Sequence, residues 1–238
     1  YEIPFDLSNV LVGDEIVVLD GYWFGSNFQK SVKKIGCKLV CIDDLANHHF
    51  YADAIINHSC DFNLARYSAE SYTKFFLGLD YLLLRPEFYL ENKNIGGKNF
   101  SVMISIGGVD HYSFSYKLSE IIHQWSPKID INVLITTSFY PDHLQKLKKL
   151  QKDKKINIHS NLGARELVEL IDNSSHAVVS ASTILMECYI RQAYAASGYY
   201  SENQKHICTS MTSRGWAFNL GDLRSISDDR LKLKLFDY

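Results

Sequence analysis

The chain has 238 residues and a formal net charge of −2, from 25 Lys and Arg against 27 Asp and Glu. Its 46% hydrophobic and 22% charged residues are ordinary globular usage, which excludes a disordered or low-complexity protein. Neither sign of charge dominates, so nothing favours binding to nucleic acid or to an anionic membrane surface. No apolar stretch is long enough to span a bilayer, and no signal peptide is visible.

The first half of the chain alternates between short β-branched runs and a helical pattern. Ser26 is predicted as the N-cap of a helix that Gly36 closes. Strands are predicted at residues 15–20, 37–42, 54–56 and 81–84. Such β-α-β alternation predicts an α/β fold, with a parallel sheet and right-handed crossovers.

The second half repeats this alternation after a polar, glycine-containing stretch. Strands are predicted at residues 100–106, 129–136, 155–158, 176–180 and 194–196, and helices at 112–124, 141–152, 164–171, 184–191 and 204–214. The predicted organisation is a partial N-terminal lobe at 1–90, a linker at 91–99, a C-terminal lobe at 100–222 and a tail at 223–238 that can form a helix. The first lobe has few strands and the chain begins at Tyr1, so we expect an N-terminal segment to be missing.

The five cysteines are an odd number, scattered through apolar contexts without a CxxC spacing: Cys37, Cys41, Cys60, Cys188 and Cys208. This pattern predicts reduced core residues of a cytoplasmic protein, not a disulfide framework or a zinc site. The nine histidines show no metal-ligand spacing either, and isolated ones such as His58 are expected to be structural or surface residues. We therefore expect no metal centre and no cofactor.

A glycine pair, Gly107-Gly108, directly follows a predicted strand. Glycines at the carboxyl end of a parallel strand let the backbone approach a ligand, and open α/β sheets bind ligands at that edge. The alternative interpretation is an ordinary turn, which glycine pairs also form.

Small polar residues stand where another predicted strand passes into a helix, at Ser182 and Thr183. Backbone N–H groups at a helix N-terminus favour a diphosphate. Glu187, four residues after Thr183, can accept hydrogen bonds from ribose hydroxyls. The alternative is that Ser182 or Thr183 caps the helix and that Glu187 complements its dipole.

Other polar residues end strands or begin helices. Asn203 and Gln204 can bind sugar or phosphate oxygens or cap a helix. Tyr22 follows the first predicted strand. The paired acids Asp43 and Asp44 end the next one, where they can act as acid–base groups or metal ligands or form a turn that caps a helix. The GxGxxG, GxxxxGK[ST], GxSxG and HExxH motifs are absent, which argues against dehydrogenase, P-loop, α/β-hydrolase and zincin chemistry.

Taken in order, several segments resemble the UDP-2,4-diacetamido-2,4,6-trideoxy-β-L-altropyranose hydrolases of pseudaminic acid biosynthesis, relatives of MurG-type glycosyltransferases with the GT-B fold. The resemblance covers nearly the whole chain, and LLLRPEF and GGVD are its most specific pieces. The matching segments are IVVLDGYWF, LVCIDDLANHHFYADAIINHS, FLGLDYLLLRPEF, VMISIGGVD, SHAVVSASTILMECYIR and ENQ.

The resemblance implies two Rossmann-like lobes with a cleft between them, and a UDP-sugar as the small-molecule partner. Gly107, Gly108, Ser182, Thr183, Glu187 and Gln204 match nucleotide-binding segments. Asn203 and Tyr22 match positions near the reacting sugar. The segment around Leu162 precedes a helix that contacts uracil through backbone in related folds.

Two departures from this family concern its catalytic base. The family's glycine-rich loop, with a histidine that activates water, has no counterpart and would lie upstream of Tyr1. In addition, Gly21 replaces the histidine of an Asp-His-Tyr segment. The leading hypothesis is a cytoplasmic UDP-sugar hydrolase of nonulosonic acid or surface polysaccharide biosynthesis. The alternatives are a MurG-like glycosyltransferase and a non-catalytic nucleotide-sugar-binding relative.

Overall fold

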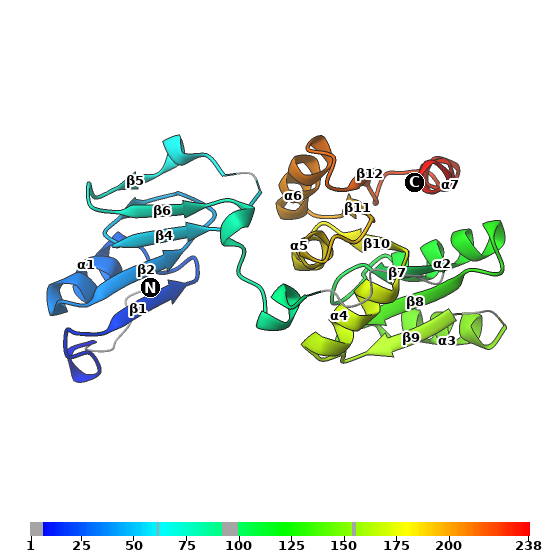
Figure 1. Ribbon diagram of the computed structural model, residues 1–238, viewed down its shortest axis with the longest axis horizontal. Coiled ribbons are helices and arrows are strands. Elements are labelled where there is room, and N and C mark those ends of the chain that lie inside the picture. Colours follow the sequence, from blue (N-terminus) through cyan, green and yellow to red (C-terminus); the bar gives the residue numbers. More distant parts are fainter. Residues whose placement is uncertain (1–6, 61, 92–99, 154–155) are drawn as a thin grey trace. The chain divides into compact units, whose positions relative to one another are not determined.

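The computed structural model describes residues 7–60, 62–91, 100–153 and 156–238. The chain forms two compact units, Tyr1–Leu83 and Leu84–Tyr238, here called unit 1 and unit 2 (Figure 1). The predicted linker at 91–99 lies outside the described residues except for Glu91. Among the described residues, no helix is long and apolar enough to cross a membrane.

Unit 1 is built on a four-stranded, fully parallel sheet with strand order β1-β2-β4-β6. Its core lies between this sheet and α1, where Val32, Leu39 and Ile55 are fully buried. Its elements are η1 (Leu7–Asn9), β1 (Ile16–Asp20), α1 (Ser26–Ile35), β2 (Lys38–Ile42), β3 (His49–Phe50), β4 (Ala54–Asn57), η2 (Leu64–Arg66), β5 (Ser68–Ala69), β6 (Lys74–Leu77) and η3 (Leu79–Tyr81).

Two predictions for unit 1 were wrong. The fourth strand is β6, not residues 81–84, because Gly78 turns the chain with a φ of +100° and a 3-10 turn follows it. The N-cap of α1 is Gly25, not Ser26, whose hydroxyl donates instead to the His49 carbonyl at 2.6 Å. The predicted C-cap is confirmed, since Gly36 adopts a left-handed φ of +111° there.

Unit 2 is a doubly wound sheet of six parallel strands in the order β12-β11-β10-β7-β8-β9. The chain leaves β7 in one direction for β8 and β9, then returns to the other side of β7 for β10, β11 and β12. The elements are η4 (Pro86–Tyr89), β7 (Ser101–Ser105), α2 (Phe114–Trp125), β8 (Asp130–Ile135), α3 (Pro141–Asp153), β9 (Ile156–Ser160), α4 (Ala164–Asn173), β10 (His176–Ser180), α5 (Thr183–Ile190), β11 (Ala195–Tyr199), α6 (Glu202–Ser213), β12 (Phe218–Asp222) and α7 (Asp228–Asp237). The strand order reverses between β7 and β10, and such a switch point is where open α/β sheets bind ligands.

Helices cover both faces of this sheet (Figure 1). α2 and α3 lie on one face, and α7 packs beside α2 through Trp125 and Phe236, whose ring centroids are 5.3 Å apart. α4 and α5 lie on the other face, as right-handed crossovers in opposite directions require. Sequence analysis missed β12, whereas a helix does form in the tail as α7, capped by the Ser227 hydroxyl.

All five cysteines are free and buried. Burial raises the pKa of the Cys41 thiol to about 12 and that of Cys208 to about 11, so neither forms the reactive thiolate near neutral pH. We expect the native protein to resist alkylation by iodoacetamide at pH 8, and to take up five labels once unfolded in guanidinium. Mass spectrometry counts the labels, and rapid labelling of the folded chain would contradict the burial.

Candidate functional site

The carboxyl ends of β7, β10 and β11 lie next to each other in unit 2, and three predicted segments follow them. Gly107 follows β7 with a φ of +82°. A Cβ atom there would lie 2.6 Å from the Tyr200 hydroxyl and 3.6 Å from Ser180 Oγ. The Tyr200 hydroxyl donates to the Ile106 carbonyl at 3.1 Å. The loops after β7 and β11 therefore meet across the end of β10, beside the switch point.

Hydrogen bonds fix the part of the turn that follows Gly107. The Gly108 carbonyl accepts a hydrogen bond from the Thr136 hydroxyl. Asp110, fully buried, accepts the backbone N–H groups of Phe114 at 2.8 Å and Ser115 at 2.9 Å. The acid of the GGVD segment thus caps α2 and occupies N–H groups that a phosphate would need.

The N-terminus of α5 differs from that of α2. Ser182 is its N-cap residue and Thr183 its first residue, and the Ser182 side chain makes no capping hydrogen bond there. The Ser182 hydroxyl instead lies 3.2 Å from Ser180 Oγ. Thr183 is exposed at this helix N-terminus, beside the switch point, whereas the Ser182 N–H donates to the Ser180 carbonyl at 2.8 Å.

Glu187 lies one turn into α5, with its side chain only 9% exposed. Its Oε1 accepts a hydrogen bond from Arg85 Nη2 at 3.3 Å. Burial raises the pKa of the Glu187 carboxyl, and the Arg85 guanidinium acts in the opposite direction. The acid predicted to bind ribose is therefore an ion-pair partner of the arginine in the LLLRPEF segment.

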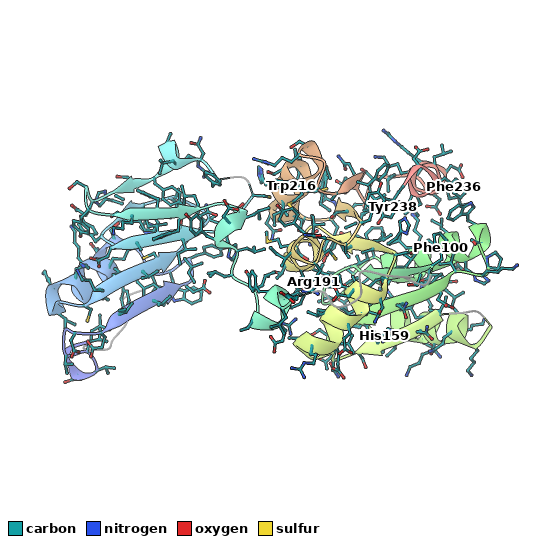
Figure 2. The ribbon with its side chains drawn as sticks, viewed as in Figure 1. Phe100, His159, Arg191, Trp216, Phe236 and Tyr238 are labelled. Atoms are coloured by element: carbon teal, nitrogen blue, oxygen red, sulfur yellow. The ribbon has the colours of Figure 1, made fainter. Side chains whose placement is uncertain are left out.

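A second arginine attaches this same segment to the helices of unit 2. Arg191, which is labelled in Figure 2, donates to the Asp172 carboxylate through Nε at 2.9 Å and Nη2 at 2.5 Å. Its Nη1 donates to the carbonyls of Phe88 and Leu90. This buried guanidinium holds residues 86–90 against α4 and α5. Part of the LLLRPEF motif therefore serves to attach this segment to the two helices.

Asn203 and Gln204 lie in the first turn of α6, after β11. Asn203 is exposed, and its Oδ1 accepts the Ser201 hydroxyl at 2.6 Å. Gln204 is buried, and its Oε1 accepts the Tyr200 N–H at 3.1 Å. The two amides shape the start of α6 and the loop that carries Tyr200.

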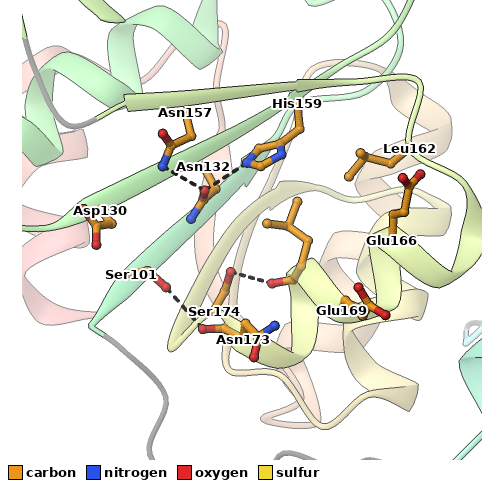
Figure 3. Close-up of a pocket in the computed structure, with 11 residues that line it drawn as sticks. Ser101, Asp130, Asn132, Asn157, His159, Leu162, Glu166, Glu169, Asn173 and Ser174 are labelled. Atoms are coloured by element: carbon orange, nitrogen blue, oxygen red, sulfur yellow. Dashed lines mark hydrogen bonds between the residues drawn. The ribbon is translucent and has the colours of Figure 1, made fainter.

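Leu162 lies elsewhere in unit 2, in a polar pocket of about 400 Å³ between α4 and the strands β8 and β9 (Figure 3). Asn132 Oδ1 accepts from the Asn157 amide at 3.4 Å and lies 2.9 Å from His159 Nε2. The Gly163 N–H next to Leu162 donates to Glu166 at 2.7 Å, which occupies one backbone donor of the segment matched to uracil binding.

Tyr22 lies in unit 1, in a pocket of about 610 Å³ at the carboxyl ends of β1, β2 and β4. Asp43 lines the pocket but is already used, because its Oδ1 accepts the Ala46 N–H at 2.7 Å as a capping turn requires. Asp44 is the other acid of the pair. Its negative charge is the largest of the effects that raise the pKa of the Tyr22 phenol. Tyr22 therefore stays a neutral hydrogen-bonding group at neutral pH.

His58 lines the same pocket, and sequence reasoning missed it. It directly follows β4, the neighbour of β2 in the sheet, so its place at the ligand edge depends on strand order and not on any motif. Its Nδ1 is buried and has no hydrogen-bond partner among the described residues. Those residues contain no group of three His, Cys, Asp or Glu side chains that could hold a metal ion.

No model of a known protein family matches this chain. Over 222 residues it is 27% identical to the UDP-2,4-diacetamido-2,4,6-trideoxy-β-L-altropyranose hydrolase of Campylobacter jejuni, covering 90% of this chain and 78% of that protein. The chain is a distant homologue of that hydrolase. It is also 26% identical over 204 residues to an uncharacterised protein of Methanocaldococcus jannaschii, covering 80% of this chain and 41% of that protein.

Solved structures similar to this chain include OtsA (TM-score 0.58, 12% identity) and MurG of Acinetobacter baumannii (TM-score 0.56, 13% identity). Each match covers 97% of this chain and 66% of the other, so the chain spans slightly less than two thirds of their length. At such identities the likeness concerns the fold. The predicted class, α/β with parallel sheets and GT-B structural neighbours, is confirmed.

Proposed function

We propose that this protein is a UDP-sugar hydrolase of nonulosonic acid or surface polysaccharide biosynthesis, which releases the sugar from UDP by attack of water. The observation that carries this proposal is the homology to a UDP-sugar hydrolase across 90% of the chain. Unit 2 offers a matching place for the nucleotide, at the switch point of a doubly wound sheet.

The diphosphate binds at the N-terminus of α5. The partial positive charge of a helix N-terminus attracts a phosphate, and its first N–H groups can donate to the phosphate oxygens. The Ser182 side chain makes no capping hydrogen bond to this helix, and the glycine turn after β7 lies at the same edge of the sheet. Backbone donors alone can hold a diphosphate in this way, so the proposal requires no metal ion or cofactor.

The ribose binds next to the diphosphate, at Glu187. One carboxylate oxygen accepts from Arg85, which holds the side chain in place. The other oxygen is the proposed acceptor for a ribose hydroxyl. A hydrogen bond to a charged group contributes about 1.5–3 kcal/mol, so the loss of Glu187 has a measurable effect on affinity.

The test of this nucleotide site is calorimetry with UDP. We expect the wild-type chain to bind UDP, and Glu187→Ala to bind it about 10–100-fold more weakly, the equivalent of one charged hydrogen bond. Asp237→Ala removes an exposed carboxylate at the end of α7, outside every proposed binding segment; it is the control and should keep the wild-type affinity. The site assignment is wrong if the wild-type chain does not bind UDP at millimolar concentration, or if both variants lose affinity equally.

Product analysis tests the reaction itself. A panel of UDP-sugars is incubated with the protein, with and without acceptor sugars. Formation of free sugar and UDP in the absence of an acceptor supports hydrolysis. Turnover that requires an acceptor contradicts the proposal and supports a glycosyltransferase, whereas UDP binding without any turnover supports a non-catalytic relative.

A further inference from the structure

The pocket that α4 forms with β8 and β9 lies against a polar part of the sheet in unit 2 (Figure 3). Strands of a parallel sheet that has helices on both faces usually carry apolar side chains on both sides. β8 alternates instead, since Ile131 is buried in the core whereas Asp130 and Asn132 line the pocket on the other face. β9 continues this polar strip with Asn157 and His159. The sequence therefore keeps this area polar where packing alone would favour apolar residues.

Asn132 is held in one orientation at the centre of this strip. Its Oδ1 accepts a hydrogen bond from the Asn157 amide at 3.4 Å and lies 2.9 Å from His159 Nε2. Because a carbonyl oxygen only accepts, His159 carries its proton on Nε2. The amide nitrogen of Asn132 points away from these two neighbours (Figure 3) and has no partner among the described residues. Asn132 therefore offers unused N–H donors to the pocket.

His159 offers an acceptor next to these donors. Burial lowers the pKa of His159 below its usual 6.5, so its imidazole is neutral at physiological pH. With the proton on Nε2, the lone pair of Nδ1 can accept a hydrogen bond, and no described residue donates one to it. A sugar hydroxyl both donates and accepts, so two neighbouring hydroxyls match the donor of Asn132 and the acceptor of His159.

The remaining polar groups of the pocket differ in whether they are free to bind a ligand. Ser101 and Ser174 are buried, and their hydroxyls donate to the carbonyls of Asn173 at 3.3 Å and Leu170 at 2.7 Å. These two hydroxyl protons are therefore used within the protein. Glu169 lines the pocket from α4, and its exposed carboxylate has no partner among the described residues.

The charge and size of the pocket exclude a phosphate and fit an uncharged ligand. Asp130, Glu166 and Glu169 line it, and no lysine or arginine does so in the described part of the chain. Three carboxylates repel a diphosphate but not a neutral sugar. Leu162 and Leu170 add apolar surface for the C–H groups of a sugar ring. The volume of about 400 Å³ is within the range of small-molecule sites.

We propose that this pocket is a carbohydrate site that binds an uncharged pyranose sugar without a nucleotide. The Asn132 amide donates to one sugar hydroxyl, His159 Nδ1 accepts from its neighbour, and Glu169 accepts from a third. The pocket is built from β8, β9 and α4, whereas the proposed UDP site follows β7, β10 and β11. The carbohydrate site goes beyond the proposed function and does not require that the protein hydrolyses a UDP-sugar.

Calorimetry with neutral hexoses and N-acetylhexosamines, added without nucleotide, tests this site. We expect at least one of these sugars to bind the wild-type chain, and Asn132→Leu to bind it about 10-fold more weakly, the equivalent of one or two hydrogen bonds. Glu169→Gln, at an exposed position of α4, should also weaken binding and cannot disturb the core. Asn27→Leu, the same substitution as at position 132 but on the exposed side of α1, is the matched control and should keep the wild-type affinity.

Calorimetry with UDP separates this pocket from the nucleotide site. Asn132→Leu should bind UDP as tightly as the wild type does. If it loses UDP affinity and sugar affinity equally, the pocket belongs to the nucleotide site and the proposal is wrong. The proposal also fails if no sugar binds at millimolar concentration, or if Asn132→Leu and Glu169→Gln both bind the sugar like Asn27→Leu. A wild-type chain that binds a neutral sugar through Asn132 but does not bind UDP would support this site and contradict only the proposed function.

Discussion

Replacement of Arg191 by alanine is expected to lower the free energy of unfolding by about 3–5 kcal/mol. The guanidinium is 3% exposed and pairs with an Asp172 carboxylate that is 8% exposed. Without Arg191 this carboxylate stays buried without its counter-charge, and the Phe88 and Leu90 carbonyls lose their donor. Urea unfolding followed by circular dichroism measures the loss.

Arg224→Ala is the matched control for this prediction. Arg224 also makes a two-point contact with an aspartate, Asp222, but its side chain is 37% exposed. Exposed ion pairs contribute about 0–1 kcal/mol, so this variant should remain close to wild-type stability. Equal losses in the two variants would show that burial of the Arg191 pair does not stabilise unit 2.

Gly107→Ala is expected to cost about 1–3 kcal/mol of stability, because residues with a side chain are strained at a left-handed φ. The φ of Gly107 is +82°, and the new Cβ would lie 2.6 Å from the Tyr200 hydroxyl. The turn must shift to relieve this contact, so we also expect weaker UDP binding. Chemical denaturation and calorimetry measure the two effects separately.

Gly108→Ala provides the comparison at the next residue. A Cβ atom at Gly108 would lie 3.8 Å from Thr136 Oγ1, its nearest neighbour, which is an ordinary van der Waals distance. The φ of Gly108 is not positive. A surface substitution that introduces no strain changes the free energy of unfolding by no more than about 0.5 kcal/mol. The double variant Gly107→Ala, Tyr200→Phe removes the close oxygen and leaves the backbone strain, so any recovery measures the steric part. If Gly107→Ala and Gly108→Ala behave alike, the left-handed turn is not required.

Much of the fold could be predicted because buried parallel strands have a local signature. The runs that form β1, β2 and β10 are short, β-branched and bounded by turn residues, and each was placed within one or two residues. The prediction was wrong at residues 81–84, where an apolar run is not a strand. Apolar character alone does not distinguish a strand from a packed loop, and Gly78 had already ended the pairing with β4.

The candidate site could be predicted only in part, because some of its contacts join residues that lie far apart in the sequence. Gly107, Ser182 and Thr183 were found because strand–turn–helix junctions are visible in sequence, and all three lie at the switch point of unit 2. The partner of Glu187 could not be predicted, since Arg85 is 102 residues away along the chain. The role of Asp110 in capping α2 also had no signal in the GGVD motif.

The sequence by itself determined the α/β class, the strand–helix order, the reduced state of the cysteines and the resemblance to UDP-sugar hydrolases, because each depends on local pattern or on motif order. Only the tertiary structure decided which strand ends are neighbours, and hence that His58 shares a pocket with Tyr22 and that Gly107 meets Tyr200. Strand order in a parallel sheet follows from crossovers between distant segments, so no local signal in the sequence carries it.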